Sequence, residues 1–175
     1  MMEVHFRQAH RGNYRPAMRG QGQIAYLVSH STAGGGENAE SEAVRLAREV
    51  VSVSVHYLVD ERAVWQAVRE SDIAWHCGTR RVYFHPYCRN ENSLGIALCS
   101  RLRDGRYSIP EETVARAAAL VRRLMARYAI PADNVLRHYD VTHKTCPTPF
   151  VESAAAWQAF QSRLRADEPA PVSCL

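Results

Sequence analysis

The chain has 175 residues, which is the length of one compact domain and too short for two ordinary ones. With 46% hydrophobic and 23% charged residues, its composition excludes a chain that is disordered, collagen-like or of low complexity as a whole. The 22 basic and 18 acidic residues leave a net charge of +4, which favours an anionic polymer as partner without requiring nucleic acid.

The chain lacks the sequence signals of export and membrane insertion. Residues 1–7 contain no apolar core of a signal peptide, and no run of about 18 apolar residues occurs. We therefore expect synthesis in the cytoplasm without stable membrane insertion. The five cysteines are odd in number and include no Cys-x-x-Cys spacing, so they predict no disulfide framework. At least one of them is then free, reactive or metal-bound.

The first half of the chain predicts strands, a helix and a long irregular segment. A polar, arginine-rich lead-in over residues 1–23 precedes a buried strand that ends at His30. Residues 38–51 have helical spacing with acidic residues in the first turn. Residues 53–68 alternate in two short segments that predict a hairpin. Residues 71–92 mix aromatic, histidine, arginine and proline residues without periodicity, which is typical of a functional loop.

The second half predicts a strand at 93–99 and then a long amphipathic helix that begins after Pro110 and continues to Tyr128. A short strand at 135–138 leads into a proline-punctuated loop over 142–149. A last amphipathic helix is predicted over residues 152–165.

Strands interleaved with two long helices predict an α/β fold, a single domain with a central mixed β-sheet flanked by helices. We expect residues 1–23 to pack on the domain as a lead-in, residues 24–166 to form the domain itself, and residues 167–175 to be a flexible tail. No internal repeat or linker divides the chain, and we expect a monomer.

Three side chains are candidates for a zinc site. His30 closes the first predicted strand, His138 closes the last, and Cys146 lies in the loop that follows. Because strand ends at one edge of a sheet converge, two imidazoles and a thiolate can bind Zn²⁺ there and leave a fourth position for water. That set is catalytic rather than structural. The spacing alone is weak, since each histidine also fits a hydrogen-bonded residue at a strand end.

Five segments between residues 24 and 150 carry further motifs: LVSHSTAG (27–34), VSVHYLVD (53–60), AWHCG (74–78), NSLGI (92–96), and HYD (138–140) continuing to KTCP (144–147). In this order they resemble the zinc-dependent N-acetylmuramoyl-L-alanine amidases of the phage-lysozyme, AmpD and peptidoglycan-recognition-protein superfamily. The resemblance implies the amidase fold, with His30, His138 and Cys146 as zinc ligands and Lys144 as the catalytic lysine. Non-catalytic peptidoglycan-recognition relatives lack a ligand at the position of Cys146.

The implied reaction is hydrolysis of the amide bond between N-acetylmuramic acid and L-alanine. Zinc lowers the pKa of its bound water to about 7 and polarises the carbonyl group. Lys144 can supply positive charge to the tetrahedral intermediate, although an exposed loop lysine is the default interpretation of such a residue.

The strand at 94–98 departs from the family pattern. Many members read IGIEL, with the glutamate as general base and acid, whereas this chain reads LGIAL with Ala97. Other members place a tyrosine immediately before the hairpin histidine, a position that Val55 takes here. Losing a positioned acid/base typically costs about 10² to 10⁴ in rate. We therefore expect a chain that binds zinc and muropeptide but hydrolyses slowly.

Other residues are alternative proton carriers. Tyr57, expected on the same strand face as Val55, is one, and His76 and His143 are the others. Each also has a structural interpretation: Tyr57 as a core aromatic, His76 as a hydrogen-bonding pocket wall, and His143 as a solvated loop residue. Ala97 is either natural or a deliberate inactivation, which the sequence does not separate.

The irregular segment is the expected wall for glycan and stem peptide. Aromatic faces stack on sugar rings and arginines clamp carboxylates, although filling beneath a long loop is an equally acceptable interpretation. The candidate substrate-binding residues are Trp75, His76, Tyr57, Arg80 and Arg89. Cys77 and Cys88 bracket the loop, as a disulfide if the protein acts outside the cell or as buried thiols if it does not.

We interpret the chain as a peptidoglycan amidase that uses Zn²⁺ and is weakly active or inactive in this form. The alternative is a non-hydrolytic, zinc-containing peptidoglycan-binding or regulatory module, and a third option is a metal-free binding domain. In the absence of an export signal, a bacteriolytic phage or prophage endolysin released by a holin is favoured. A dedicated secretion route and cytoplasmic recycling of wall fragments stay open.

Overall fold

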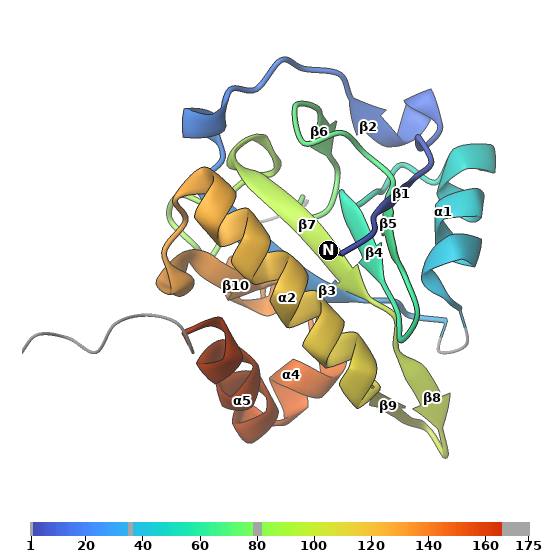
Figure 1. Cartoon of the computed structure of the whole chain (residues 1–175), viewed down its shortest axis with the longest axis vertical. Coiled ribbons are helices and arrows are strands. Elements are labelled where there is room, and N and C mark those ends of the chain that lie inside the picture. The colour runs from blue at the N-terminus through green and yellow to red at the C-terminus, as the bar shows by residue number, and fades with distance from the viewer. Residues whose placement is uncertain (1, 35–36, 79–81, 166–175) are drawn as a thin grey trace, which may run out of the picture.

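A six-stranded mixed sheet forms the centre of the computed structural model, which describes residues 2–34, 37–78 and 82–165 (Figure 1). The strands lie in the order β1-β5-β4-β7-β3-β10. β4, β7, β3 and β10 are mutually parallel, while β5 pairs with β4 antiparallel and with β1 in parallel. The bounds of the six strands are β1 (His5–Phe6), β5 (Val64–Gln66), β4 (Tyr57–Val59), β7 (Ser93–Leu98), β3 (Tyr26–Ser31) and β10 (Val135–Arg137).

Helices cover both faces of this sheet, which confirms the predicted α/β class. The longest helix, α2, and the C-terminal helix α5 pack on one face, and α1 lies on the other (Figure 1). The helices are α1 (Ala39–Arg48), α2 (Glu111–Tyr128), α3 (His138–Thr142), α4 (Thr148–Glu152) and α5 (Ala154–Leu164). Two small antiparallel pairs lie outside the central sheet: β2 (Tyr14–Arg15) with β6 (Ile73–Ala74), and β8 (Arg101–Arg103) with β9 (Arg106–Ser108). The described residues also form four short 3-10 helices: Arg11–Asn13, Gln21–Gln23, Asn90–Asn92 and Ala132–Asn134.

The central strand β7 is buried on both faces, which explains its nearly continuous apolar sequence. Leu94, Ile96 and Leu98 belong to the core beneath α2. Ala97 belongs to the second core beneath α1. Because side chains alternate along a strand, the residue that replaces the expected glutamate faces the α1 side. In the parallel register its neighbour on β3 is His30.

Helix α2 forms where its sequence predicts it. Glu111 and Glu112 lie in its first turn, where negative charge stabilises the helix dipole. Its last residue is followed by Ala129 in the left-handed conformation, with φ of 52°. The buried apolar residues recur at helical spacing and face the sheet: Ala117, Ala118, Leu120, Val121 and Leu124.

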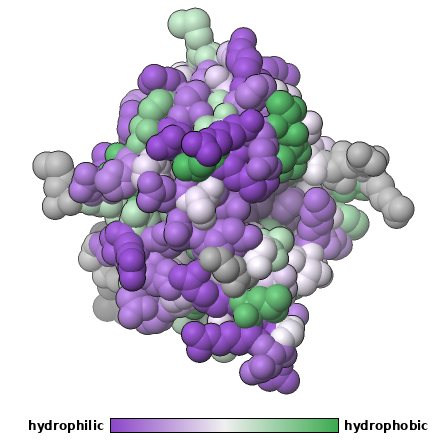
Figure 2. Space-filling view, turned by 90° about the vertical axis from the view of Figure 1, so that its right-hand side faces the viewer, coloured by the Kyte–Doolittle hydropathy of each residue, from purple (hydrophilic) through white to green (hydrophobic). Residues whose placement is uncertain are grey.

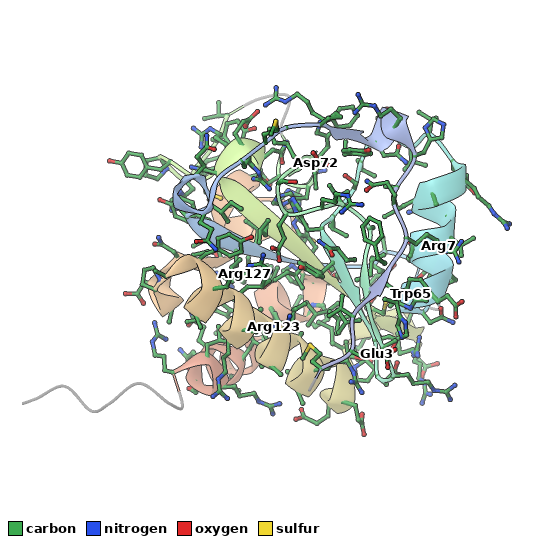
Figure 3. All side chains as sticks on the ribbon, turned by 45° about the horizontal axis from the view of Figure 1, so that its top comes forward. Glu3, Arg7, Trp65, Asp72, Arg123 and Arg127 are labelled. Atoms are coloured by element: carbon green, nitrogen blue, oxygen red, sulfur yellow. The ribbon has the colours of Figure 1, made fainter. Side chains whose placement is uncertain are left out.

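The lead-in is part of the packed structure. Its strand β1 lies along β5, and the Arg7 guanidinium lies 5.6 Å from the ring centre of Trp65 (Figure 3). Further along, Arg19 donates hydrogen bonds from its two terminal nitrogens to five backbone carbonyls: those of Asn90, Glu91, Ser93, Glu70 and Asp72. Two of these carbonyls lie just before β6, and the other three lie just before β7 or at its first residue. The lead-in therefore joins segments that are distant in sequence.

Several elements differ from the predictions. The last helix is divided into α4 and α5, because Ser153 is extended and caps α5 by accepting a hydrogen bond from the Ala156 amide. His138 is the first residue of α3 rather than the last of a strand. The hairpin β8–β9 was not predicted; its turn contains Gly105 with φ of 72°. The expected tail at 167–175 lies outside the described residues.

The side of the molecule that carries α1 is mainly hydrophilic, with small separate apolar patches (Figure 2). Of the helices in the described ranges, none combines the length and the apolar composition that crossing a bilayer requires.

Candidate metal centre and active site

Two histidines and a cysteine from separate segments lie together at the carboxyl ends of neighbouring strands. His30 is near the end of β3, and His138 directly follows β10, the parallel neighbour of β3. Their ring centroids are 4.6 Å apart, and the Cys146 Sγ lies 3.9 Å from the His30 Nδ1. One ligand atom from each of the three residues lies within 4.8 Å of the others. The predicted convergence is therefore present.

The three side chains fit a zinc ion by their chemistry. The His138 Nε2 is buried and has no hydrogen-bond partner in the described structure. A buried polar atom without a partner is costly unless a ligand satisfies it. Two imidazoles and one thiolate form a set of three protein ligands that leaves one tetrahedral position open to water, as in catalytic zinc sites.

Burial keeps both imidazoles uncharged. It lowers the pKa of His30 well below the usual value, and the neighbouring His138 and Lys144 act in the same direction. Burial and Lys144 lower the pKa of His138 to about 4. Neutral imidazole is the form that binds metal. Burial raises the pKa of the Cys146 thiol, while Ser31 and Lys144 act in the opposite direction; a bound cation would favour the thiolate.

Lys144 is exposed and precedes Cys146 by two residues in the loop. The Cys146 amide donates a hydrogen bond to the Lys144 carbonyl at 2.7 Å, which fixes the short turn between them. The positive charge of Lys144 acts on both histidines and on the thiol. The lysine is thus close enough to influence a charge that develops at this centre.

His76 connects the centre to the interior. Its Nδ1 lies 3.1 Å from the His30 Nε2, and its Nε2 lies 3.1 Å from the Ser93 Oγ. Gly95 on β7 leaves room for this ring, because a Cβ built there would lie 2.6 Å from the His76 Cγ. No real side chain tolerates such an approach without displacement of the ring. The glycine of the LGIAL segment is therefore required by the position of His76.

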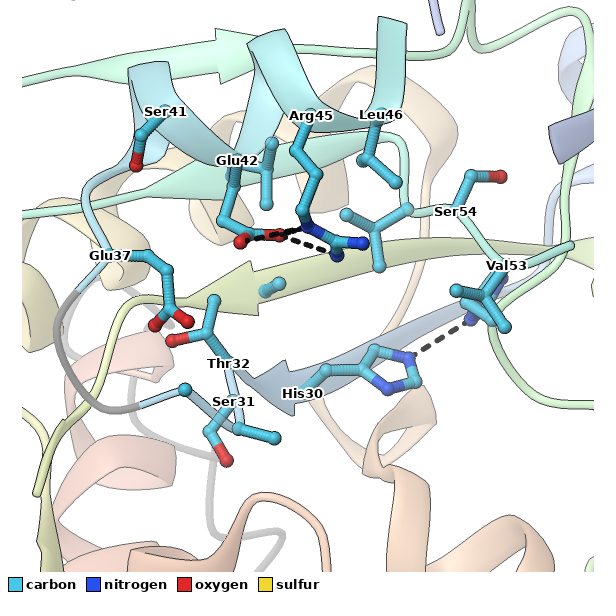
Figure 4. Close-up of a pocket in the computed structure, with 16 residues that line it drawn as sticks. His30, Ser31, Thr32, Glu37, Ser41, Glu42, Arg45, Leu46, Val53 and Ser54 are labelled. Carbon is cyan, nitrogen blue, oxygen red and sulfur yellow. Dashed lines mark hydrogen bonds and ion pairs between the residues drawn. The ribbon is translucent and has the colours of Figure 1, made fainter. Parts of the chain in front are cut away.

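A pocket of about 480 Å³ adjoins the centre (Figure 4). His30 and Ala97 line it from the central sheet, His76 lines it from the segment that follows β6, and α1 lines it from the opposite side. Val55 also lines it. The positions at which a glutamate or tyrosine was expected therefore face the same pocket, and neither carries a titratable group.

An ion pair from α1 enters this pocket. The Arg45 Nε donates to both carboxylate oxygens of Glu42 at 3.2 Å, and its Nη2 donates to one of them at 2.8 Å. The Glu42 side chain is 10% exposed and that of Arg45 40% exposed. In Figure 4 both side chains extend from α1 toward the strand that carries His30. The wall of the pocket formed by α1 is thus charged.

Comparison with known proteins agrees with this geometry. Residues 20–149, more than half of the chain, match the family model described as N-acetylmuramoyl-L-alanine amidase. A probable N-acetylmuramoyl-L-alanine amidase of Bacillus licheniformis is 33% identical over 145 residues, which cover 79% of this chain and 40% of that relative.

The chain belongs to the N-acetylmuramoyl-L-alanine amidase family.

Solved structures share its fold. The PlyG catalytic domain has a TM-score of 0.77 at 24% identity and covers 99% of this chain and 100% of that domain. The amidase AmiD from E. coli, solved with anhydro-N-acetylmuramic acid-L-Ala-D-gamma-Glu-L-Lys, has a TM-score of 0.61 at 25% identity, covering 85% of this chain and 60% of AmiD. The chain spans 40–44% of the length of the first curated relatives it matches.

Tyr57 does not reach the pocket of this amidase-family domain. Its ring lies in the core beneath α2, and its hydroxyl donates to the Glu70 carboxylate at 2.5 Å. Val55 packs with the core on the α1 side. The expectation that Tyr57 shares a face with Val55 was wrong, because the backbone bends at His56 and strand alternation begins only at β4. Tyr57 is a core residue.

The other expected substrate-binding residues have different environments. Trp75 is half-buried and its backbone pairs with that of Ser54, which lines the pocket. The Arg89 guanidinium lies 3.8 Å from the ring centre of Tyr83 and donates to the carbonyls of His85 and Cys88, so it holds the loop together. Arg80 lies outside the described residues.

The structure also shows the environments of His143 and of the two cysteines, Cys77 and Cys88. His143 is exposed and stacks between Phe84 and Tyr139, with ring centroids 3.4 and 5.0 Å away. Cys77 and Cys88 are both fully buried thiols in one small apolar cluster. Of the alternatives for this pair, the structure contains the buried thiols.

Sequence reasoning missed two features of the site. The first is the pair of Glu42 and Arg45, although opposite charges three residues apart on a predicted helix were a usable signal. The second is Ser93, a polar residue at the start of an otherwise apolar strand.

Proposed function

We propose that this chain hydrolyses the amide bond between N-acetylmuramic acid and L-alanine in peptidoglycan, with a zinc ion held by His30, His138 and Cys146. The observation that carries the proposal is the convergence of these three side chains within 4.8 Å at the edge of a pocket. Membership of the amidase family supports the substrate class. Three ligands rather than four are typical of a catalytic zinc.

The residues of the chain have separate parts in this reaction. Bound zinc would supply a water of lowered pKa and a Lewis acid for the carbonyl oxygen. Lys144 would add positive charge near the oxyanion that develops on the substrate. The departing amino group of L-alanine needs a proton, and Ala97 has none to give. We therefore propose slow hydrolysis, limited by proton transfer.

The pocket beside the centre is the proposed place of the stem peptide. Its volume of about 480 Å³ is in the usual range of small-ligand sites. AmiD, which shares the fold, binds a muropeptide with the sequence L-Ala-D-gamma-Glu-L-Lys. Trp75, next to the pocket, offers an aromatic face for the sugar. We propose that the chain acts on the cell wall after release, as an endolysin does, or on wall fragments in the cytoplasm.

A second candidate is a zinc-containing module that binds peptidoglycan without cutting it. Ala97 is the observation that favours it, since the pocket wall formed by β7 and the segment before β4 carries no proton carrier.

One experiment separates the two candidates. Zinc content and the release of free L-alanine amino groups from purified peptidoglycan are measured for the chain, for Cys146→Ser and for Ala97→Glu. The hydrolase predicts one zinc per chain, slow release that Cys146→Ser abolishes, and faster release by Ala97→Glu. Wall binding with no release by either the chain or Ala97→Glu indicates the binding module. Absence of bound zinc contradicts both candidates.

A further inference from the structure

A hydrogen-bonded chain of side chains leads from the proposed zinc ligand His30 to a backbone carbonyl. We infer that His76 and Ser93 hold His30 in the tautomer that carries its proton on Nε2, which leaves the Nδ1 lone pair free for the metal. The inference rests on the proposed zinc site and adds two positioning residues to it. It follows from the direction of each hydrogen bond in the chain.

The direction of the hydrogen bonds is determined by Ser93, at the end of the chain that is remote from the metal centre. The Ser93 Oγ lies 2.5 Å from the backbone carbonyl of Arg89, and a carbonyl oxygen only accepts. The single proton of Ser93 is therefore used there. Toward His76, at 3.1 Å, the Ser93 oxygen must accept, so the His76 Nε2 carries a proton.

A neighbouring thiol does not alter this assignment. Cys77 lies 3.9 Å from the Ser93 Oγ but only 3.2 Å from the Oδ1 of Asn90. That oxygen also accepts the backbone amides of His76 and Cys77, which identifies it as oxygen rather than nitrogen. The Cys77 thiol therefore donates to Asn90.

The hydrogen bond between His76 and His30 then determines which nitrogen of His30 carries the proton. The hydrogen-bond partners of the His76 side chain in the described structure are His30 and Ser93, neither of them an anion. A buried imidazole without an anionic partner is neutral. With its proton on Nε2, the His76 Nδ1 is an acceptor, so the His30 Nε2 donates to it over 3.1 Å.

The remaining nitrogen of His30 faces the Cys146 thiol. Its Nδ1 lies 3.9 Å from the Cys146 Sγ, within the group whose ligand atoms are all within 4.8 Å of one another. Metal-binding histidines usually donate their second N–H to an acceptor that fixes tautomer and orientation, and loss of that acceptor typically lowers metal affinity by about 10- to 100-fold. Here a neutral imidazole takes the acceptor role.

The test reads the tautomer directly in the metal-free full-length chain. Imidazole ¹⁵N NMR at neutral pH distinguishes Nε2–H from Nδ1–H on His30, and zinc affinity is measured by competition with a chelator. We expect Nε2–H on His30 in the unmodified chain. His76→Phe, which has no acceptor, should lose that preference and bind zinc about 10- to 100-fold more weakly. His76→Asn, whose side-chain oxygen can occupy the Nδ1 position, should recover much of the affinity.

A matched pair of serine variants provides the control. Ser93→Ala removes the acceptor that orients His76. Ser100→Ala removes a buried hydroxyl that also donates to a carbonyl at 2.5 Å, that of Thr32, but that forms no hydrogen bond with a histidine in the described part of the chain. Ser93→Ala should weaken zinc binding and Ser100→Ala should not. Circular dichroism and thermal melts verify that both variants fold.

Two results overturn the inference: a proton on the Nδ1 of His30 in the metal-free chain, or equal zinc affinities for Ser93→Ala and Ser100→Ala. Failure of the proposed function looks different. Nε2–H on His30 and the expected zinc affinities, together with no cleavage of muropeptide by Ala97→Glu, support the positioning role and contradict the hydrolase.

Discussion

Ala97 occupies the position at which a carboxylate would reach the pocket next to His30. Its methyl group lies between Leu58 and His30 in the register of the sheet and contributes one side of the pocket. The residue therefore removes a proton carrier without disturbing the three candidate ligands, which come from other segments.

Ala97→Glu should raise the rate of amide hydrolysis by about 10² to 10⁴, because a carboxylate can accept a proton from the attacking water and return it to the leaving amine. The rate is measured as free L-alanine amino groups released from muropeptide at saturating zinc. Ala97→Gln is the control, since it has the same shape and transfers no proton. Equal rates for the two variants would contradict the prediction.

Gly95 is a second single residue on which the site depends, because of its small size rather than because of charge. Gly95→Ala should lower the free energy of unfolding by about 1–3 kcal/mol, because its Cβ would lie 2.6 Å from the His76 Cγ and overpack the site. Gly22→Ala is the control, since a Cβ there meets no atom within 4 Å. Urea unfolding of both variants in the metal-free state measures the effect. A Gly95→Ala protein as stable as Gly22→Ala would refute this assignment of strain.

At the scale of elements, the lead-in determines how the irregular segment is held. The segment has few regular backbone pairings, and Arg19 supplies donors to carbonyls on both sides of it. The same guanidinium lies 2.9 Å from the His56 Nε2. A stretch of the lead-in that belongs to no helix or strand thus connects the two ends of the irregular segment.

Arg19→Ala should cost more than about 3 kcal/mol of unfolding free energy, since it leaves several partly buried carbonyls without donors. Arg15→Ala is the matched control: its exposed ion pair with Glu91, at 3.0 Å, should contribute less than about 1 kcal/mol. Denaturant melts of both variants compare the two losses. If both variants lost a similarly small amount of unfolding free energy, water would be replacing the hydrogen bonds of Arg19, which would contradict the prediction.

At the scale of the whole molecule, buried histidines connect stability to pH. His56 is fully buried, where its Nδ1 accepts the Gly95 amide at 3.0 Å. Burial, and next the charge of Arg19, lower the pKa of His56 to about 3. Above pH 6.5 the imidazole is neutral in both folded and unfolded states. Below that pH only the unfolded state gains the proton, so stability is lost as the pH falls toward about 3.

This group should therefore contribute a loss of about 1.4 kcal/mol per pH unit below pH 6.5. Urea unfolding of the metal-free chain at about pH 7.5 and about pH 5.5 measures the loss, and His56→Asn removes this part of it while retaining an acceptor for the Gly95 amide. The variant should be less stable at the higher pH but less sensitive to acid. An identical pH dependence for both proteins would contradict the assignment.

Much of the fold was predictable because local signals agreed with the tertiary environment. The α2 sequence carries a continuous apolar stripe, and β7 is apolar after its first residue, Ser93, because both of its faces are covered. The division of the last helix at Ser153 was not predicted, since serine is common both within and before helices. Likewise, Tyr57 was assigned to the wrong face because alternation starts only where β4 begins to pair.

The sequence by itself determined the α/β class, the amidase family and the three residue types suited to zinc, because these depend on periodicity, motif order and side-chain chemistry. Only the tertiary structure decided which nitrogen of His30 faces Cys146, that Gly95 makes room for His76, and that Glu42 and Arg45 enter the pocket. These are relations between residues 19 to 116 positions apart in the sequence, or between two layers of the fold. They arise from packing distances of a few ångströms, which the local sequence pattern does not encode.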